Sequence, residues 1–277
     1  MNNYEKLEGM VAATFTPLDE NGDVNLSVID KYADWIASTP IKGVFVCGTT
    51  GEFSSLAIDE RKLILEKWLV SARKRFKVIA HVGSNCQRSA MELARHAAQV
   101  GADAIASIAP SFFKPGTVDE LVDFFAPICH SAAGLPFYYY NMPSITGVNL
   151  PVDKFLVEGK KKIPNLVGTK FTHNNLMEMG VCIELEQHRF EVLHGYDEIL
   201  ISGLAMGAVA GVGSTYNYIP NVYQAIFDSM KMNDLETARH NQIKSIRTVE
   251  VIIKYGGGVR GGKAIMKLIG IDCGSCR

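Results

Sequence analysis

The segment Asn165-Leu166-Val167-Gly168-Thr169-Lys170 joins a short apolar run to a lysine. Such a run is typical of a buried strand, and buried strands rarely carry lysine. The free lysine amine has a pKa near ~10.4, so only about one amine in two thousand is neutral at pH 7. Burial lowers that pKa, and a neutral lysine at the mouth of an apolar barrel is a nucleophile suited to Schiff-base chemistry. A surface lysine just past the end of a strand would give the same local pattern.

Similar apolar runs alternate with amphipathic segments along most of the chain. The predicted strands are Val11–Phe15, Gly43–Cys47, Lys77–Val82, Ala104–Ala109, Pro136–Tyr140, Leu166–Lys170, Glu191–His194 and Ala208–Val212. The predicted helices between them are Ser27–Ser38 with Ser27 as N-cap, Asp59–Arg75, Ser89–Val100, Val118–Ser131, Leu176–Glu186 and Glu198–Met206. This alternation predicts parallel strands covered on both sides. Eight units favour an α/β fold of the closed (β/α)8 TIM barrel type over an open doubly wound sheet, which the same periodicity also allows.

The chain continues past the eighth strand with helices predicted at about Asn221–Met232, Leu235–Lys254 and Gly262–Ile269. A minimal barrel does not need all of them. We therefore expect two parts: residues 1–218 as the barrel core through strand eight, and residues 219–277 as the last barrel helix and a C-terminal helical extension.

The size and net charge of the chain limit the classes of binding partner that are expected. The 277 residues have an apolar fraction of 47% and a formal net charge of −1, which favours neither nucleic acid nor an anionic membrane. No stretch is long and apolar enough for a bilayer, and the start at Met1–Lys6 lacks a signal-peptide layout. The six scattered cysteines fit reduced thiols in a cytoplasmic protein. A small-molecule partner is expected.

Polar residues at the strand ends are the candidate site, because barrel enzymes build their sites there. The stretch Gly48-Thr49-Thr50-Gly51 could cradle a carboxylate through its amides and hydroxyls, or could be an ordinary turn. Within Tyr138-Tyr139-Tyr140, alternation puts the first and third rings on one face. If Tyr140 faces the barrel interior near Lys170, its phenol can move protons; otherwise it is core packing.

Two further stretches follow strands seven and eight. The adjacent acids Asp197 and Glu198 could bind substrate hydroxyls or could simply begin a helix. The glycines around Ser214 could allow close approach of a ligand or tight closure of the barrel.

Other patterns are decoys. The run Gly257–Lys263 matches most of a phosphate-binding loop, but Ala264 stands where magnesium ligation needs Ser or Thr. The Cys273–Cys276 pair has no second ligand pair, and the histidines form no metal pattern, so no metal site is expected. His81 is most simply a hydrogen-bonded core histidine.

Four motifs occur together and in order: Gly48–Glu52, Tyr140–Pro143, Gly168–Lys170 and Gly211–Ser214. With them the chain, from about Gly9 to its end, resembles the pyruvate-dependent class I lyase family that includes N-acetylneuraminate lyase and dihydrodipicolinate synthase. The resemblance implies a (β/α)8 barrel with a C-terminal helical extension, usually in a homotetramer, and no metal or organic cofactor.

Within that family, the details resemble the sialic acid lyase branch. Tyr138–Val148 looks like that branch's strand-five signature, and Ile145 stands where synthases usually carry an arginine for a carboxylate. One departure is Phe112-Phe113, near which many members have a tyrosine that reaches a neighbouring subunit. Another is that the chain ends at Arg277, before the family's usual C-terminal helix.

The resemblance implies cleavage of N-acetylneuraminate to N-acetylmannosamine and pyruvate. Lys170 would form the Schiff base and Tyr140 would assist proton transfer. The implied substrate-binding residues are Thr49, Thr50, Thr172, Gly195, Asp197, Glu198 and Ser214. The alternatives are another enzyme of the family, such as a dihydrodipicolinate synthase or a 2-keto-3-deoxy sugar acid aldolase, and a non-catalytic sugar-acid sensor on the same barrel.

Overall fold

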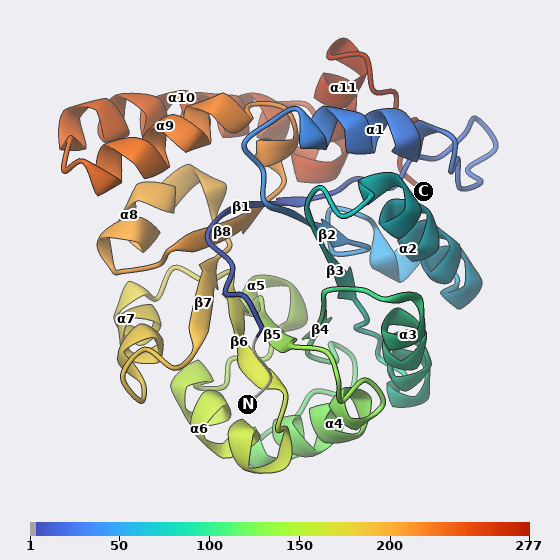
Figure 1. The fold of residues 1–277 in the computed structure, drawn as a ribbon, viewed down its shortest axis with the longest axis vertical. Helices are drawn as coiled ribbons and strands as arrows, with labels where there is room; N and C mark the ends of the chain where they lie inside the picture. The colour runs from blue at the N-terminus through green and yellow to red at the C-terminus, as the bar shows by residue number, and fades with distance from the viewer. Residues whose placement is uncertain (1–3) are drawn as a thin grey trace.

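The eight predicted strands close into one parallel barrel in the computed structural model, which describes residues 4–277 (Figure 1). Residues 1–3, part of the start expected to lack a signal peptide, lie outside the described residues. The strands are β1 Gly9–Ala13, β2 Gly43–Val46, β3 Lys77–His81, β4 Ala104–Ile108, β5 Phe137–Asn141, β6 Leu166–Phe171, β7 Glu191–His194 and β8 Ala210–Gly213. Strand β1 begins two residues before its predicted start because Gly9 pairs with Ala210 and closes the ring. The open-sheet alternative is wrong.

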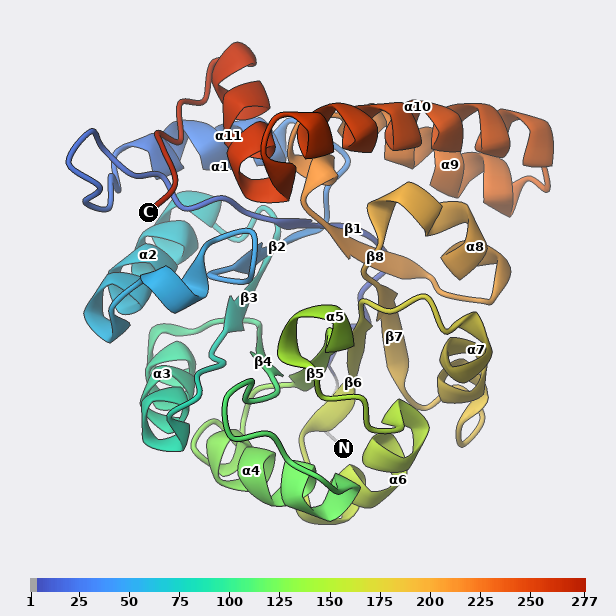
Figure 2. The same ribbon diagram turned by 180° about the vertical axis from the view of Figure 1, so that it is seen from behind.

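Helices surround the barrel and extend past it. The helices are α1 Val28–Ala37, α2 Ile58–Ala72, α3 Gln87–Val100, α4 Val118–His130, α5 Pro143–Thr146, α6 Val152–Lys162, α7 Leu176–Glu184, α8 Leu200–Ala205, α9 Pro220–Lys231, α10 Leu235–Lys254 and α11 Gly257–Leu268. Three short 3₁₀ turns are η1 Phe53–Ser55, η2 Asp197–Ile199 and η3 Thr215–Asn217. The C-terminal pair α9 and α10 packs side by side along one edge (Figures 1 and 2).

Helix α6 was not among the predicted segments. Its buried residues are Val152, Phe155, Leu156 and Gly159, which have the spacing of an amphipathic helix. The helix follows Pro143, Gly147 and Pro151. Because these residues are typical of turns and loops, the sequence did not indicate a helix here. Parallel strands β5 and β6 need a crossover connection, so the topology itself requires a segment here.

Ser27 occupies the N-cap position of α1, but its side chain makes no capping hydrogen bond to that helix. Its hydroxyl donates instead to Asn25 Oδ1 at 2.6 Å. Side-chain caps are found at α4, α7 and α10, where Thr117, Asn175 and Asp234 accept a backbone N–H.

The barrel separates two apolar cores. The interior core is built from inward-facing residues that include Val11, Phe45, Tyr138 and Tyr140. Tyr139 faces outward and packs on Phe125 and Phe155 beneath α4 and α6. The predicted alternation of the three tyrosines is therefore confirmed.

The N-terminal segment covers the end of the barrel opposite the predicted site (Figure 1). Leu7 N–H donates to Glu191 Oε1 at 3.1 Å, and Tyr138 donates its hydroxyl to the other oxygen of Glu191. Burial raises the pKa of Glu191 above its ordinary value. Helix α5 lies at the other end of the barrel, where the strands have their carboxyl ends (Figure 2).

No helix within residues 4–277 is long and apolar enough to span a membrane. The phosphate-loop-like run lies inside helix α11, where a Cβ on Gly261 would lie 2.8 Å from the Ile252 carbonyl oxygen. Gly261 and Gly262 therefore serve close packing of this helix. The division at residue 218 stays a prediction; it falls between β8 and α9.

The first prediction concerns Gly168, which lies in register with Tyr138 and Glu191. A Cβ at Gly168 would collide with the Glu191 carbonyl oxygen. We expect Gly168→Ala to lower the free energy of unfolding by about 1–3 kcal/mol in urea titration.

In the control Gly258→Ala, the new Cβ meets nothing within 4 Å on helix α11. It should hold stability or raise it by up to ~1 kcal/mol. Equal effects of the two substitutions would contradict the packing argument.

Candidate active site

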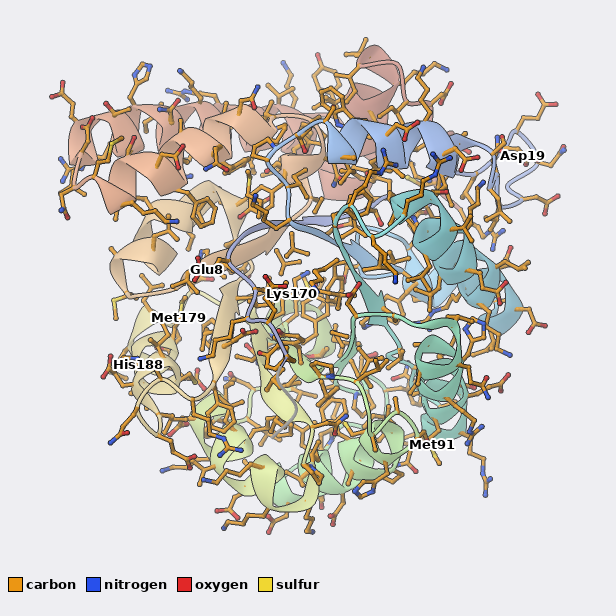
Figure 3. The ribbon with its side chains drawn as sticks, viewed as in Figure 1. Glu8, Asp19, Met91, Lys170, Met179 and His188 are labelled. Atoms are coloured by element: carbon orange, nitrogen blue, oxygen red, sulfur yellow. The ribbon has the colours of Figure 1, made fainter. Side chains whose placement is uncertain are left out.

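Lys170 lies at the carboxyl end of β6 and points into the barrel, at the centre of the molecule (Figure 3). Its backbone pairs with Tyr140 of β5, so both side chains face the interior at one level. Only 4% of the Lys170 surface is exposed. The surface-lysine alternative is therefore wrong.

The Lys170 amine is surrounded by aromatic rings and has no close carboxylate partner. Its Nζ lies 4.1 Å from the centre of the Tyr140 ring and 4.4 Å from that of Phe45. Within residues 4–277, Lys170 makes no ion pair or side-chain hydrogen bond. Burial lowers the pKa of Lys170 to about 7, and the negative charge of Asp197 only partly opposes this. A large fraction of the amines is thus neutral at neutral pH.

Tyr140 brings a proton-bearing group to the same place. Its hydroxyl lies 3.2 Å from Thr49 Oγ1 and donates to Met142 Sδ at 3.0 Å. Burial raises the pKa of Tyr140 to about 12, although the hydroxyls of Thr49 and Thr172 act in the opposite direction. The phenol therefore keeps its proton at neutral pH and can donate or relay it.

The loop after β2 carries Thr49 and Thr50, both half-buried. Its turn is closed by Glu52 N–H, which donates to the Thr49 carbonyl at 3.0 Å. Gly48 is required here because a Cβ would lie 2.7 Å from the Phe45 ring that packs on Lys170. The loop thus brings Thr49 to Tyr140, a contact that the sequence did not indicate.

Thr172 and Gly195 lie next to each other after β6 and β7. Gly195 N–H donates to the Phe171 carbonyl at 2.9 Å, and a Cβ on Gly195 would collide with Thr172 Oγ1. The Thr172 side chain is buried. Its hydroxyl is near enough to lower the pKa of Tyr140, but it makes no hydrogen bond of good geometry within residues 4–277. It is available to an incoming polar group.

The two acids after β7 differ in their surroundings. Asp197 is buried, and its Oδ2 accepts from Thr215 N at 2.9 Å and from Thr215 Oγ1 at 2.6 Å. This carboxylate therefore joins the β7 and β8 turns, although it also begins η2. Burial raises the pKa of Asp197 to about 6, opposed by the Thr215 hydrogen bonds. Glu198 and Ser214 are both half-buried.

Asp197 Oδ1 is buried without a hydrogen-bond partner in the described part of the chain. It lies against Gly213, where a Cβ would collide with it. The glycine of β8 thus leaves room for the chain's own Asp197 carboxylate, which differs from the ligand approach that the sequence suggested.

Three contributors to the site were not identified from the sequence: Phe45, Met142 and Thr215. Met142 lies inside the Tyr140–Pro143 motif and Thr215 directly follows the Gly211–Ser214 motif. Nothing in the local pattern showed that a thioether would meet Tyr140 or that a hydroxyl would bind Asp197. Phe45 could have been found, because alternation places every second residue of β2 inside the barrel.

His81 is the hydrogen-bonded core histidine that was expected. Its Nδ1 lies 2.8 Å from the Cys47 carbonyl, and its ring packs on Phe53 and Tyr140. Burial lowers the pKa of His81 well below its ordinary value, so the ring is neutral. Among residues 4–277, no group of three or more His, Cys, Asp or Glu side chains is placed to hold a metal.

A family model described as the dihydrodipicolinate synthetase family matches residues 6–277. This chain belongs to that family. The membership expected from the four motifs is confirmed, as is the barrel.

The most similar relatives support the same branch. The N-acetylneuraminate lyase of Mus musculus is 43% identical over 277 residues, covering 99% of this chain and 87% of the relative. That of Homo sapiens is 42% identical over the same shares. Among solved structures, the Proteus mirabilis N-acetylneuraminate lyase superposes with a TM-score of 0.96 at 37% identity, covering 99% of this chain and 92% of that one. The Aquifex aeolicus dihydrodipicolinate synthase has a TM-score of 0.90 at 25% identity, covering 98% of this chain and 91% of that one.

The buried amine makes a prediction for stability. Replacing Lys170 by methionine should raise the free energy of unfolding at pH 7 by about 1–4 kcal/mol, because an uncompensated buried charge is removed. Between pH 7 and about 10.5, Lys170 is protonated in the unfolded chain but neutral in the native protein. The free energy of unfolding of the wild type therefore increases with pH over this range, whereas the variant lacks this contribution. Urea titrations from pH 6 to pH 9 should therefore show the gap narrowing as pH rises.

Lys154→Met is the matched control, since the Lys154 side chain is 70% exposed. Its effect should stay near zero over this pH range. A Lys170→Met variant less stable than wild type at pH 7 would contradict the burial argument.

Proposed function

We propose that this protein is a Schiff-base aldolase that cleaves N-acetylneuraminate to N-acetylmannosamine and pyruvate. The observation that carries the proposal is the buried Lys170 amine, with its pKa lowered to about 7, beside the protonated phenol of Tyr140. The names of relatives matched along the whole chain support the choice of substrate.

The reaction begins when the neutral Lys170 amine attacks the C2 ketone of the open-chain sugar. Loss of water gives a protonated imine, which withdraws electrons from the neighbouring bonds. The C3–C4 bond then breaks, its electron pair forms the enamine, and the C4 hydroxyl loses its proton as the aldehyde of N-acetylmannosamine forms. Protonation of the enamine at C3 and hydrolysis of the imine release pyruvate and the free amine.

Tyr140 is proposed to relay protons during imine formation and at the C4 hydroxyl. The Lys170 amine lies against the Tyr140 ring, and the Tyr140 hydroxyl lies 3.2 Å from the Thr49 hydroxyl. Thr49 and Thr50 are proposed to hold the C1 carboxylate, since hydroxyls and loop amides donate to anions. The unpartnered Thr172 hydroxyl is a further donor to the bound substrate.

The hydroxylated tail of the substrate is proposed to bind at the turns that follow β7 and β8. The residues proposed to bind it are Gly195, Asp197, Glu198 and Ser214. Asp197 Oδ2 accepts hydrogen bonds from Thr215, so Oδ1 is the oxygen available to accept one from a sugar hydroxyl. Ile145 is 60% exposed near the mouth and offers no cation for an aldehyde partner that carries a carboxylate. This favours the sugar substrate over the dihydrodipicolinate synthase reaction.

We further propose a cytoplasmic homotetramer that needs no cofactor. All six cysteines are free thiols, which fits a reducing compartment. The loop side chains Phe112 and Phe113 are 76% and 85% exposed, an apolar surface that an assembly would cover. Light scattering at several protein concentrations measures the assembly directly, and a monomer at every concentration would exclude it.

The test of function is pyruvate release from N-acetylneuraminate together with borohydride trapping. The wild type should release pyruvate, and reduction in the presence of pyruvate should add one reduced pyruvyl group to Lys170 alone. Lys170→Ala should do neither. An adduct without sialic acid cleavage would leave another keto-acid aldolase of the family, to be sought with 2-keto-3-deoxy sugar acids. Binding without any adduct would indicate the sensor.

A second prediction concerns the phenol. Tyr140→Phe removes one hydroxyl and keeps the ring that packs on Phe45, so the fold and thermal stability should be nearly unchanged. The rate of pyruvate release should fall by about 10²–10⁴-fold, the usual contribution of a positioned acid–base group. Tyr139→Phe is the matched control on the outer face, and its rate should stay within about twofold of wild type. Equal rates for the two variants would remove Tyr140 from the mechanism.

A further inference from the structure

A buried ion pair joins the Thr49 loop to the C-terminal helix α11. Lys263 Nζ lies 2.7 Å from Glu52 Oε1, and the two side chains are only 2% and 8% exposed. Glu52 itself adopts the left-handed conformation, with φ 56°, where the loop enters η1. The backbone of Glu52 closes the Thr49 turn, but neither side chain has been assigned a role in the site.

The pair is fixed from both sides. Lys263 Nζ also donates to the Ser275 carbonyl at 2.7 Å, and Glu52 Oε2 accepts from Arg277 N–H at 2.9 Å. The segment after α11 is thereby seated on the loop. Further along the same surface, the Arg277 guanidinium donates to both oxygens of Glu60.

Glycines allow helix α11 to come this close. A Cβ on Gly262 would collide with the Phe15 ring below β1, and Gly261 packs on the backbone of Ile252. The run that resembled a phosphate-binding loop therefore places Lys263 against Glu52.

The short path from Glu52 to the reacting groups passes through Thr49. Glu52 N–H donates to the Thr49 carbonyl, and the Thr49 hydroxyl lies 3.2 Å from that of Tyr140. A buried ion pair is a poor source of stability, because desolvation offsets most of the attraction, and an apolar pair would serve as well. Directional charge is better suited to fixing the orientation of a loop.

We propose that Glu52 and Lys263 are positioning residues that orient Thr49 for the carboxylate of the bound keto acid. The inference rests on the proposed function, because it assigns a role to the same site. Without the pair, the loop should still fold but should hold the Thr49 hydroxyl less well. Since the carboxylate is bound equally in the ground state and the transition state, the loss should appear as weaker binding rather than as a slower chemical step.

The experiment measures borohydride trapping of pyruvate on Lys170 as a function of pyruvate concentration. In Glu52→Gln and Lys263→Met, the half-saturating pyruvate concentration should rise about tenfold, with the limiting rate within about threefold of wild type. Lys263→Arg keeps the positive charge and should recover most of the binding.

Lys267→Met is the matched control. Lys267 is on the same helix and pairs with Asp272 at 2.8 Å, but it is exposed and does not contact the loop. Its half-saturating concentration should equal that of wild type. Thermal melts of all variants separate positioning from folding, since a merely structural pair would lower the melting temperature without moving the half-saturating concentration.

Each outcome decides the matter. Wild-type half-saturation in folded Glu52→Gln overturns the positioning role while leaving the Schiff-base reaction intact. Absence of any adduct in wild type overturns the proposed function and this inference with it. If either single variant does not fold, the double variant Glu52→Gln/Lys263→Met removes both buried charges. A raised half-saturating concentration in it supports the proposal, and a wild-type value overturns it.

Discussion

The burial of the Lys170 amine is the constraint on which the site depends. An ammonium surrounded by the rings of Tyr140 and Phe45 loses its hydration and gains no ion pair, so its pKa falls to about 7. Asp197, the acid that has an electrostatic effect on Lys170, is itself held by Thr215 and has a raised pKa. A carboxylate in direct contact with Lys170 would stabilise the ammonium form and raise the pKa of the amine. The amine would then be protonated at neutral pH and could not act as a nucleophile.

The barrel supports this arrangement in layers. One level below Lys170 and Tyr140, Tyr138 and Glu191 form a buried hydrogen-bonded pair that the N-terminal segment covers. The closed lower end leaves the upper end to the loops. There Thr49, Thr172 and Gly195 come from three separate connections. Thr172 and Gly195 are positioned by backbone hydrogen bonds to the neighbouring strand, and Thr49 by the turn bond from Glu52 N–H.

Much of this follows from local sequence. The strand pattern predicted the barrel, and alternation predicted which tyrosines face inward. The apolar run ending in lysine allowed either the buried amine that is found or a surface lysine. Local pattern fails where the decisive contact joins distant segments. Thr215 binds Asp197 across two strands, and Lys263 meets Glu52 across most of the chain. Helix α6 shows a different failure, because its short amphipathic repeat follows a run of turn-forming residues.

The most direct test of the central claim is the acidity of the Lys170 amine itself. Competitive labelling with acetic anhydride, followed by peptide mass spectrometry over a range of pH, reports the neutral fraction of an individual lysine relative to a free amine standard. The account predicts that acetylation of Lys170 reaches half its maximal rate near pH 7 in the unliganded protein. Half-maximal acetylation above about pH 10, the value of an ordinary lysine, would contradict it.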